Sequence, residues 1–564
     1  MASHNGGWYV ARTLHELGVT DVFSLSGGHI NPIYNAIAEF GIRLIDTHHE
    51  QGAAMAADAY GRLKRRPGVC LVTAGPGFTN TLTGVAGAYL SNSPLIVLSG
   101  KSGIEENDRL PLQEIDQRSM ATPVTKWARD VYDTKRLGEY IAVAYRRAVT
   151  GRPGPVYLGM PHEVLYGSCD EAKMERYATT FPEGSARCSD ETAEKAAQAI
   201  TGAKRPVLIV GSGGWYSGAH AELLGFLERA PMPCFTLNFG RGMVPDDHPL
   251  CFGAASPSAP VAFKAVTAHA DLIVLLGIRL SLYIGWGRSF NPDARVMQVD
   301  VDPGEISRNR PADIGVVADA GGFLSQVIDY MDSRALRPDY SVWVDKATKW
   351  RDEEWAEVEL IRGSDAKPIH GIRVVKAVED VLGSEGMLAI DGGDTQVWSD
   401  TTYHVNKPGH YVKGGPLGCM GVGVPFAIGA KAAFPERRVA LISCDGAMGM
   451  NLMEFETAVR HDLPFVAVVC NDQAWGMTKH QLEIAFGRER ETVGLNLPLI
   501  PFHEVVSALG GYGEFVSEPG ELVGAIERGF ESGKPALINV PTDPSAISPS
   551  TYALTDMMMP KEKP

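Results

Sequence analysis

Two carboxylates in the last third of the chain have the types and the spacing of a cation site. Asp445 closely follows the apolar run 438–442, and Asp472 stands 27 residues later, after a second apolar run. If both runs are parallel strands, the two carboxylates lie at the sheet edge where α/β folds bind ligands. Gly446 allows close backbone approach there, and the helix that follows offers its amides to phosphate. Oxygen ligands beside a diphosphate indicate Mg²⁺, although Asp-Gly or Asn-Asp alone would more often be a turn.

The segment that joins these carboxylates is similar to a known cofactor motif. It begins with Cys444-Asp-Gly and ends with Asn471-Asp472, and so resembles the GDG and NN signature of thiamine diphosphate-dependent enzymes. The resemblance implies that Mg²⁺ is held by Asp445, Asp472 and the main-chain oxygen of Ala474, with Asn471 supporting the diphosphate. Cys444 replaces a glycine, and Asp472 replaces an asparagine but remains an oxygen ligand.

The same resemblance requires a glutamate near the start of the chain. Glu50 stands in Thr-His-His-Glu-Gln-Gly-Ala-Ala, ahead of the Gly-rich segment 73–80. The resemblance implies that Glu50 hydrogen-bonds the aminopyrimidine ring of the cofactor and promotes loss of the thiazolium proton. Alone, Glu50 would be a solvated carboxylate at a helix start, where the helix dipole favours it. The presence of both motifs favours the catalytic interpretation.

Further cofactor contacts follow from the resemblance. Met420 precedes the apolar helix expected over 424–433, in the place where the family has an apolar wedge that bends the cofactor, although a core-filling methionine is the alternative. The segment 391–396 follows a strand and should lie near the diphosphate. The cofactor-binding residues that the resemblance implies are Glu50, Thr73, Gly75, Pro76, Asn80, Gly393, Asp394, Gln396, Gly418, Met420, Asp445, Gly446, Ala447, Asp472, Ala474, Trp475, Gly476 and Met477.

A histidine after the first expected strand indicates the branch of the family. His29 is similar in place to a histidine of benzaldehyde lyases, whereas acetolactate synthases have a small or apolar residue there. An imidazole can move a proton to or from a hydroxyl near neutral pH, as cleavage of a 2-hydroxy carbonyl compound requires. A histidine that caps the next helix is the alternative. The catalytic residues implied are Glu50, His29 and Gln113.

The middle of the chain is similar to oxalyl-CoA decarboxylases and 2-hydroxyacyl-CoA lyases at 245–249 and 305–311, patterns that acetolactate synthases share. The expected function is a thiamine diphosphate- and Mg²⁺-dependent carbon-carbon lyase or carboligase. Its substrates would be 2-hydroxy carbonyl compounds, such as 2-hydroxyacyl-CoA thioesters or 2-hydroxy ketones. The alternatives are a decarboxylating carboligase of the acetolactate synthase type, with or without FAD in the central domain, and a non-catalytic subunit. The glycines of 211–214 either hold a nucleotide or make a tight turn. The lack of a full GxGxxG pattern favours the tight turn.

The elements that must position these residues are short apolar runs separated by helix-length segments, a pattern typical of parallel strands buried on both faces. The runs lie at 69–73, 94–98, 155–158, 205–210, 271–276, 295–299, 387–390, 438–442, 464–469 and 535–540. They predict an α/β fold with three doubly wound parallel-sheet domains, over 1–183, 184–345 and 346–546. The resemblance implies that the first is a pyrimidine-binding domain, the second a central Rossmann-like domain and the third a diphosphate-binding domain. The tail 547–564 shows no helical stripe. It is expected either to be a disordered end or to cover a CoA substrate as a lid.

Composition limits the partners. The formal net charge of −15 on 564 residues argues against a nucleic-acid partner. No apolar run has the length of a membrane span, and the first residues lack the regions of a signal peptide, so a cytoplasmic protein without membrane contact is expected. Eight cysteines form no CxxC pair, which predicts neither a disulfide framework nor a zinc site. In the family resembled, Glu50 and the Asp445 site meet across a subunit interface, which implies a homo-oligomer, either a dimer or a dimer of dimers.

Overall fold

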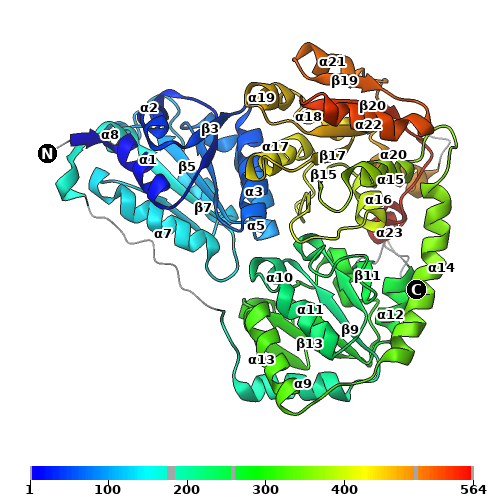
Figure 1. Cartoon of the computed structure of the whole chain (residues 1–564). Coiled ribbons are helices and arrows are strands. Elements are labelled where there is room, and N and C mark those ends of the chain that lie inside the picture. Colours follow the sequence, from blue (N-terminus) through cyan, green and yellow to red (C-terminus); the bar gives the residue numbers. More distant parts are fainter. Residues whose placement is uncertain (1–2, 175–184, 256–260, 488–492, 560–564) are drawn as a thin grey trace.

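The computed structural model describes residues 3–174, 185–255, 261–487 and 493–559. Within these ranges the strands form three six-stranded parallel sheets and one two-stranded antiparallel ribbon. Figure 1 shows the three sheets as separate α/β units, the first in blue and cyan, the second in green and the third from yellow to red. The expected α/β class with three parallel-sheet domains is therefore confirmed. No helix in the described ranges is both long and apolar enough to cross a membrane.

The first domain contains the sheet of strand order β3-β2-β4-β5-β7-β6. Alternate residues of its central strand enter two different cores, Val69 and Leu71 on one face and Cys70 and Val72 on the other, so both faces are covered. Its strands are β1 (Ser3–Asn5), β2 (Asp21–Ser24), β3 (Arg43–Asp46), β4 (Gly68–Val72), β5 (Leu95–Lys101), β6 (Trp127–Asp130), β7 (Pro155–Pro161) and β8 (Ser168–Asp170). Its helices are α1 (Gly6–Glu16), α2 (Asn31–Ile37), α3 (Glu50–Lys64), α4 (Pro76–Thr79), α5 (Leu82–Ser91), α6 (Gln117–Ala121), α7 (Leu137–Val149) and α8 (His162–Tyr166).

The central domain has the strand order β11-β10-β9-β12-β13-β14, which is the order of dinucleotide-binding doubly wound sheets. Its strands are β9 (Pro206–Val210), β10 (Cys234–Thr236), β11 (Cys251–Ala254), β12 (Leu272–Leu276), β13 (Arg295–Asp300) and β14 (Ile314–Val317). Its helices are α9 (Asp190–Gly202), α10 (Ser212–Tyr216), α11 (His220–Arg229), α12 (Val261–His269) and α13 (Ala320–Ser333). The boundary expected at 183 and 184 lies outside the described residues.

The third domain has the order β16-β15-β17-β18-β20-β19, which repeats the order of the first domain's six-stranded sheet when each sheet is numbered from its own first strand. Its strands are β15 (Met387–Ile390), β16 (Tyr411–Lys413), β17 (Val439–Cys444), β18 (Val466–Asn471), β19 (Tyr512–Phe515) and β20 (Ala536–Pro541). Its helices are α15 (Gly371–Leu382), α16 (Asp394–Thr402), α17 (Gly423–Ala433), α18 (Asp445–Met450), α19 (Glu454–Arg460), α20 (Gly476–Phe486), α21 (Phe502–Ala508) and α22 (Leu522–Glu531).

Two further helices remain, one between domains and one in the tail. Helix α14 (Ser341–Arg362) contacts α12 of the central domain and α15 of the third, and it runs through the boundary expected at 345 and 346. The tail contains helix α23 (Pro549–Met558), which packs on α20 and α16. A helix was not expected here, because the tail lacks an apolar helical stripe. The buried face of α23 instead carries threonines that make hydrogen bonds.

Helices α3 and α17 join the first and third domains and lie side by side in Figure 1. Their facing residues are small, and a Cβ at Gly429 would collide with the carbonyl of Ala56. The close approach buries this seam completely, with Ala56 and Ala430 at 0% exposure. The start of α3, where Glu50 lies, is therefore held firmly against the third domain.

Candidate active site

The first group of predicted residues lies at the carboxyl edge of the first sheet. Glu50 is the first residue of α3, just after β3, and its side chain is almost fully buried. The Asn80 amide donates to the Glu50 carboxylate at 2.9 Å. Thr73 follows strand β4, which is separated from β3 by β2 in the sheet, and its side chain lies against the backbone of Gly77. Glu50, Thr73 and Asn80 are thus brought together as predicted.

His29 lies at the same edge, in the short helical turn Gly28–Ile30 after β2. Its Nδ1 lies 3.3 Å from the Thr73 hydroxyl, and its side chain is half-buried. Burial lowers the pKa of His29, the nearby His162 lowers it further, and a hydrogen bond with Gln113 raises it. A neutral imidazole can accept a proton, so His29 is in the form that a general base requires.

Gln113 reaches this group from a loop. The Thr73 hydroxyl lies 3.4 Å from its carboxamide oxygen, and its backbone presses on Gly75. Gly75 has a φ of +58°, and a Cβ there would lie 2.8 Å from the Gln113 carbonyl, so this position requires glycine. Pro76, the last predicted member of the group, is exposed at the first position of α4.

The second group lies at the carboxyl edge of the third sheet. Asp445 directly follows β17 and begins α18. Asp472 follows the adjacent strand β18, whose Cys470 is the register partner of Cys444. The backbone amide of Ala474 donates to Asp472 at 3.2 Å. Burial and the proximity of Asp472 raise the pKa of Asp445, and burial also raises the pKa of Asp472. Two buried carboxylates thus share one place, as the sequence predicts.

The side-chain oxygens of this group are suited to bind a cation. Asp445 Oδ2 and Asn471 Oδ1 are both buried, and neither has a hydrogen-bond partner among the described residues. Buried oxygens without donors are costly unless a cation or another ligand meets them. Mg²⁺ takes oxygen ligands and would relieve the repulsion between the two carboxylates. No group of three or more His, Cys, Asp or Glu side chains that could hold a metal occurs in the described ranges, so further ligands would be backbone oxygens, phosphates or water.

Other predicted residues surround the two carboxylates. The Trp475 ring covers Gly446, and Met477 packs against Gly393. Met420 lies in the loop before α17 and is 37% exposed, so its side chain is open to a ligand rather than part of the core. The remaining predicted members at this edge are Gln396, Gly418, Ala447 and Gly476, which lie in α16, in the Met420 loop, in α18 and at the start of α20.

Asp394 has partners that the sequence does not reveal. One carboxylate oxygen accepts from the Thr551 hydroxyl at 2.6 Å and from the Ser548 backbone amide at 3.2 Å. The other oxygen lies 3.3 Å from Nδ1 of His480. These contacts attach α23 to α16 and α20, and the binding of Asp394 to a cofactor stays a prediction.

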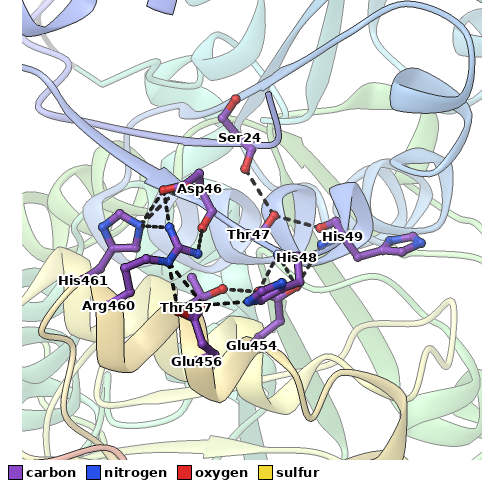
Figure 2. A network of polar contacts seen from close by, with 10 residues as sticks. All are labelled: Ser24, Asp46, Thr47, His48, His49, Glu454, Glu456, Thr457, Arg460 and His461. Atoms are coloured by element: carbon purple, nitrogen blue, oxygen red, sulfur yellow. Dashed lines mark hydrogen bonds and ion pairs between the residues drawn. The ribbon is translucent and has the colours of Figure 1, made fainter. Parts of the chain in front are cut away.

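The two groups form half-sites on different domains. No hydrogen bond or ion pair among the described residues joins a predicted member of the first group directly to one of the second. The contacts between the domains run through residues that were not predicted. Figure 2 shows them, with α19 lying along the segment between β3 and α3.

Glu454, at the start of α19, is the central residue of this network and was missed from the sequence. Its carboxylate is 1% exposed and accepts from the backbone amides of His48 and His49 and from the Thr457 hydroxyl. Burial raises the pKa of Glu454, while these donors oppose that shift. The sequence offers one signal for the role of Glu454: a glutamate stands between the apolar residues Met453 and Phe455 at the start of a helix.

Comparison with known proteins agrees with this geometry. Residues 4–120 match the family model described as thiamine pyrophosphate enzyme, N-terminal TPP binding domain. Residues 193–327 match the central domain of the same family, and residues 391–540 match its C-terminal TPP binding domain. The chain belongs to the thiamine pyrophosphate enzyme family. The cofactor expected from the sequence, thiamine diphosphate with Mg²⁺, is thereby supported, and the two half-sites lie in the N-terminal and C-terminal domains of this thiamine enzyme.

The relatives of this thiamine enzyme carry two kinds of name. The acetolactate synthase large subunit IlvG of Mycobacterium tuberculosis is 34% identical, over 97% of each chain. The 2-hydroxyacyl-CoA lyase of Arabidopsis thaliana is 30% identical over 96% of each chain, and the human 2-hydroxyacyl-CoA lyase 2 is 28% identical over 95% of this chain and 90% of its own. The family is therefore established, and overall identity leaves the reaction open.

A separate cavity of about 810 Å³ lies at the carboxyl edge of the central sheet. Its lining includes the turn after β9 at Gly211 and Ser212, Arg279 after β12, and Asp300 at the end of β13. A Cβ at Gly213 would lie 2.6 Å from the Gly277 backbone, so this segment is a tight βα turn, as expected. The turn nevertheless faces a cavity of the size that ligand sites have.

Proposed function

We propose that this thiamine enzyme is a carbon-carbon lyase or carboligase that acts on 2-hydroxy carbonyl substrates, with 2-hydroxyacyl-CoA thioesters as the first class to test. When bound, the cofactor supplies an acidic thiazolium carbon that adds to carbonyl carbons and accepts the electron pair of the bond that breaks. The protein's own residues hold that group and move protons around it. Asp445, Asp472 and the Ala474 oxygen would hold Mg²⁺ and the diphosphate, and Glu50 would hydrogen-bond the pyrimidine.

The observation that carries the proposal is the position of His29. It lies at the same sheet edge as Glu50, beside Thr73 and in hydrogen-bonding contact with Gln113. Breaking the bond next to a hydroxyl-bearing carbon leaves an aldehyde, and the hydroxyl proton must pass to a base at that moment. A half-buried, neutral imidazole is suited to receive it.

A second candidate is a carboligase of the acetolactate synthase type that decarboxylates 2-oxo acids. The 34% identity to proteins of that name supports it, and so does the central cavity, which has room for a nucleotide such as FAD. Arg279 lines this cavity and offers a guanidinium group for phosphates. A flavin spectrum of the purified protein would favour this candidate.

Product analysis of the holoenzyme separates the two. Incubation with a 2-hydroxyacyl-CoA should give the aldehyde shortened by one carbon and formyl-CoA in equal amounts. Incubation with pyruvate should give little carbon dioxide. Rapid formation of carbon dioxide and acetolactate from pyruvate, with no cleavage of the thioester or of a 2-hydroxy ketone, would assign the chain to the second candidate.

A further inference from the structure

The segment that leads into Glu50 is held by a helix of the third domain. Residues 46–49 connect β3 to α3 in the first domain, and α19 of the third domain lies along them (Figure 2). His49 is the N-cap of α3, and its Nδ1 accepts from the Gln51 amide at 3.0 Å. Since Glu50 is the next residue, any displacement of the His49 backbone also displaces Glu50.

The outer contacts of this junction are partly exposed. Arg460 and His461 lie 2.6 and 2.8 Å from the Asp46 carboxylate, and His48 Nε2 lies 2.6 Å from Glu456. Their side chains keep between 15% and 43% of their surface in solvent. Exposed ion pairs of this kind contribute little to stability.

Glu454 differs from these contacts in burial and in what it binds. Its Oε1 accepts from the His49 amide at 3.1 Å, and its Oε2 accepts from the Thr457 hydroxyl at 2.6 Å. The His48 amide lies 3.2 Å from both oxygens. Hydrogen bonds from amides to a buried carboxylate are short-range, directional and strong. The two amides belong to the two residues that precede Glu50, so this carboxylate holds the backbone on which Glu50 is mounted, whereas Arg460 and His461 contact the backbone of Asp46, four residues before Glu50.

Gly52 provides a second, independent observation. It lies in the first turn of α3, and a Cβ at this position would be 2.7 Å from Glu454 Oε1. Glycine in a helix interior is normally unfavourable compared with alanine. Its presence here leaves room for the carboxylate against the first turn.

We propose that Glu454 is a positioning residue, through which the third domain sets the Glu50 carboxylate at the start of α3. The inference rests on the proposed role of Glu50 toward the cofactor. Glu454 itself touches neither reacting group. It acts through the amides of His48 and His49, and the Glu50 to Asn80 contact depends on the register that those amides keep.

The first test compares three variants as holoenzymes. Glu454→Ala should slow exchange of the thiazolium proton for deuterium about 10- to 100-fold, as small misplacements of catalytic groups do. Glu454→Gln should keep most of the rate, because its carboxamide oxygen can accept from both amides while its NH₂ group donates to Thr457. Glu456→Ala, on the same helix and bound to the His48 side chain, is the matched control and should exchange at the wild-type rate.

The second test measures the free protein and the cofactor affinity. In apo-protein, the amides of His48 and His49 should exchange with deuterium faster in Glu454→Ala than in Glu456→Ala. Thiamine diphosphate affinity should stay the same, because the residues around Asp445 are untouched. Wild-type thiazolium exchange in Glu454→Ala, or equal losses in the alanine and glutamine variants, would overturn the proposal.

The third test uses Gly52, and it remains available if Glu454→Ala does not fold. Gly52→Ala should slow thiazolium exchange by displacing the Glu454 carboxylate, although alanine favours helix. Gly52→Ala combined with Glu454→Ala should be no slower than Glu454→Ala alone, since the collision is then absent. Additive losses would contradict the coupling.

Glu50→Gln serves as the reference variant for all three tests. If Glu50→Gln exchanges the thiazolium proton at the wild-type rate, the proposed role of Glu50 fails. Slow exchange in Glu50→Gln with normal exchange in Glu454→Ala rejects the positioning role of Glu454 alone.

Discussion

Burial keeps the His29 imidazole neutral at pH values where an exposed histidine is partly protonated. If it accepts the hydroxyl proton as the carbon-carbon bond breaks, His29→Ala should lower lyase turnover about 10²- to 10⁴-fold. Any decarboxylation of pyruvate should change only mildly, because that bond-breaking step involves no hydroxyl proton. Steady-state assays of both reactions on the same preparation provide the measurement. Equal loss of both activities would indicate a structural role.

The pH profile of the lyase reaction gives a second prediction for His29. Activity should fall as the pH drops through a pKa below the ordinary histidine value of about 6.5, because protonation removes the base. Gln113 raises the pKa of His29, so Gln113→Leu should move this acidic limb to lower pH. The pH dependence of kcat/KM for both proteins measures the shift. A limb that moves to higher pH in Gln113→Leu would contradict the contact.

Asp445 gives a prediction about stability without the metal. Burial and Asp472 raise its pKa to about 7, so the folded apo-protein holds this proton more tightly than the unfolded chain does. The stability that this proton contributes is present at low pH and is lost as the pH rises through about 7. Asp445→Asn should therefore be more stable than wild type in EDTA at pH 8, with a smaller difference at pH 5. Thermal melts with and without Mg²⁺ test this, and Glu504→Gln, at an exposed carboxylate, is the control.

At the scale of elements, helix α23 is the segment whose removal should affect substrate more than chemistry. It rests on α20, which begins at Gly476 and Met477, and on Asp394 at the start of α16. Truncation after Ala546, or Thr551→Val, should raise KM for a CoA thioester with a smaller effect on kcat. Tyr552→Ala, at an exposed position of the same helix, is the control. An unchanged KM in the truncated chain would remove the proposed lid. Lys561 and Lys563, the lysines of the tail that would suit CoA phosphates, lie outside the described residues.

The elements that could be predicted from sequence are the strands that are buried on both faces. Strands such as β4 and β17 are covered on both faces, so they show as continuous apolar runs. Edge strands β3 and β19 are only half-buried and lack that pattern, and they were not predicted. Helix α23 was missed because hydrogen bonds to Asp394, rather than apolar packing, bury its inner face.

The candidate site was predictable to a similar extent. Glu50 and the Asp445–Asp472 pair each follow a strand, and parallel strands bring their carboxyl ends to one edge, so local order was enough to place them. Glu454 could not be found in this way. Its partner His48 lies 406 residues earlier in the chain, and only the packing of two domains brings them together.

At the scale of the whole molecule, the two half-sites predict how subunits must combine. If the Glu50 half-site of one chain completes the Asp445 half-site of another, the active form is at least a dimer. Glu50→Gln and Asp445→Asn should each be nearly inactive alone. Random mixing after dissociation should restore about a quarter of wild-type activity, since half of the dimers are mixed and each holds one intact site. No recovery in dimers shown to be mixed would place the complete site within one chain.

The strand order shared by the first and third sheets has an evolutionary consequence. Helices α3 and α17 occupy equivalent places, each joining the second strand of its six-stranded sheet to the third, and they pack against each other. Duplication and fusion of one ancestral domain that paired through this helix would leave this arrangement within a single polypeptide. One copy then carries the acid-base residues and the other the cation residues. In such a lineage the small residues along the seam, including Gly429, are the positions that tolerate substitution least.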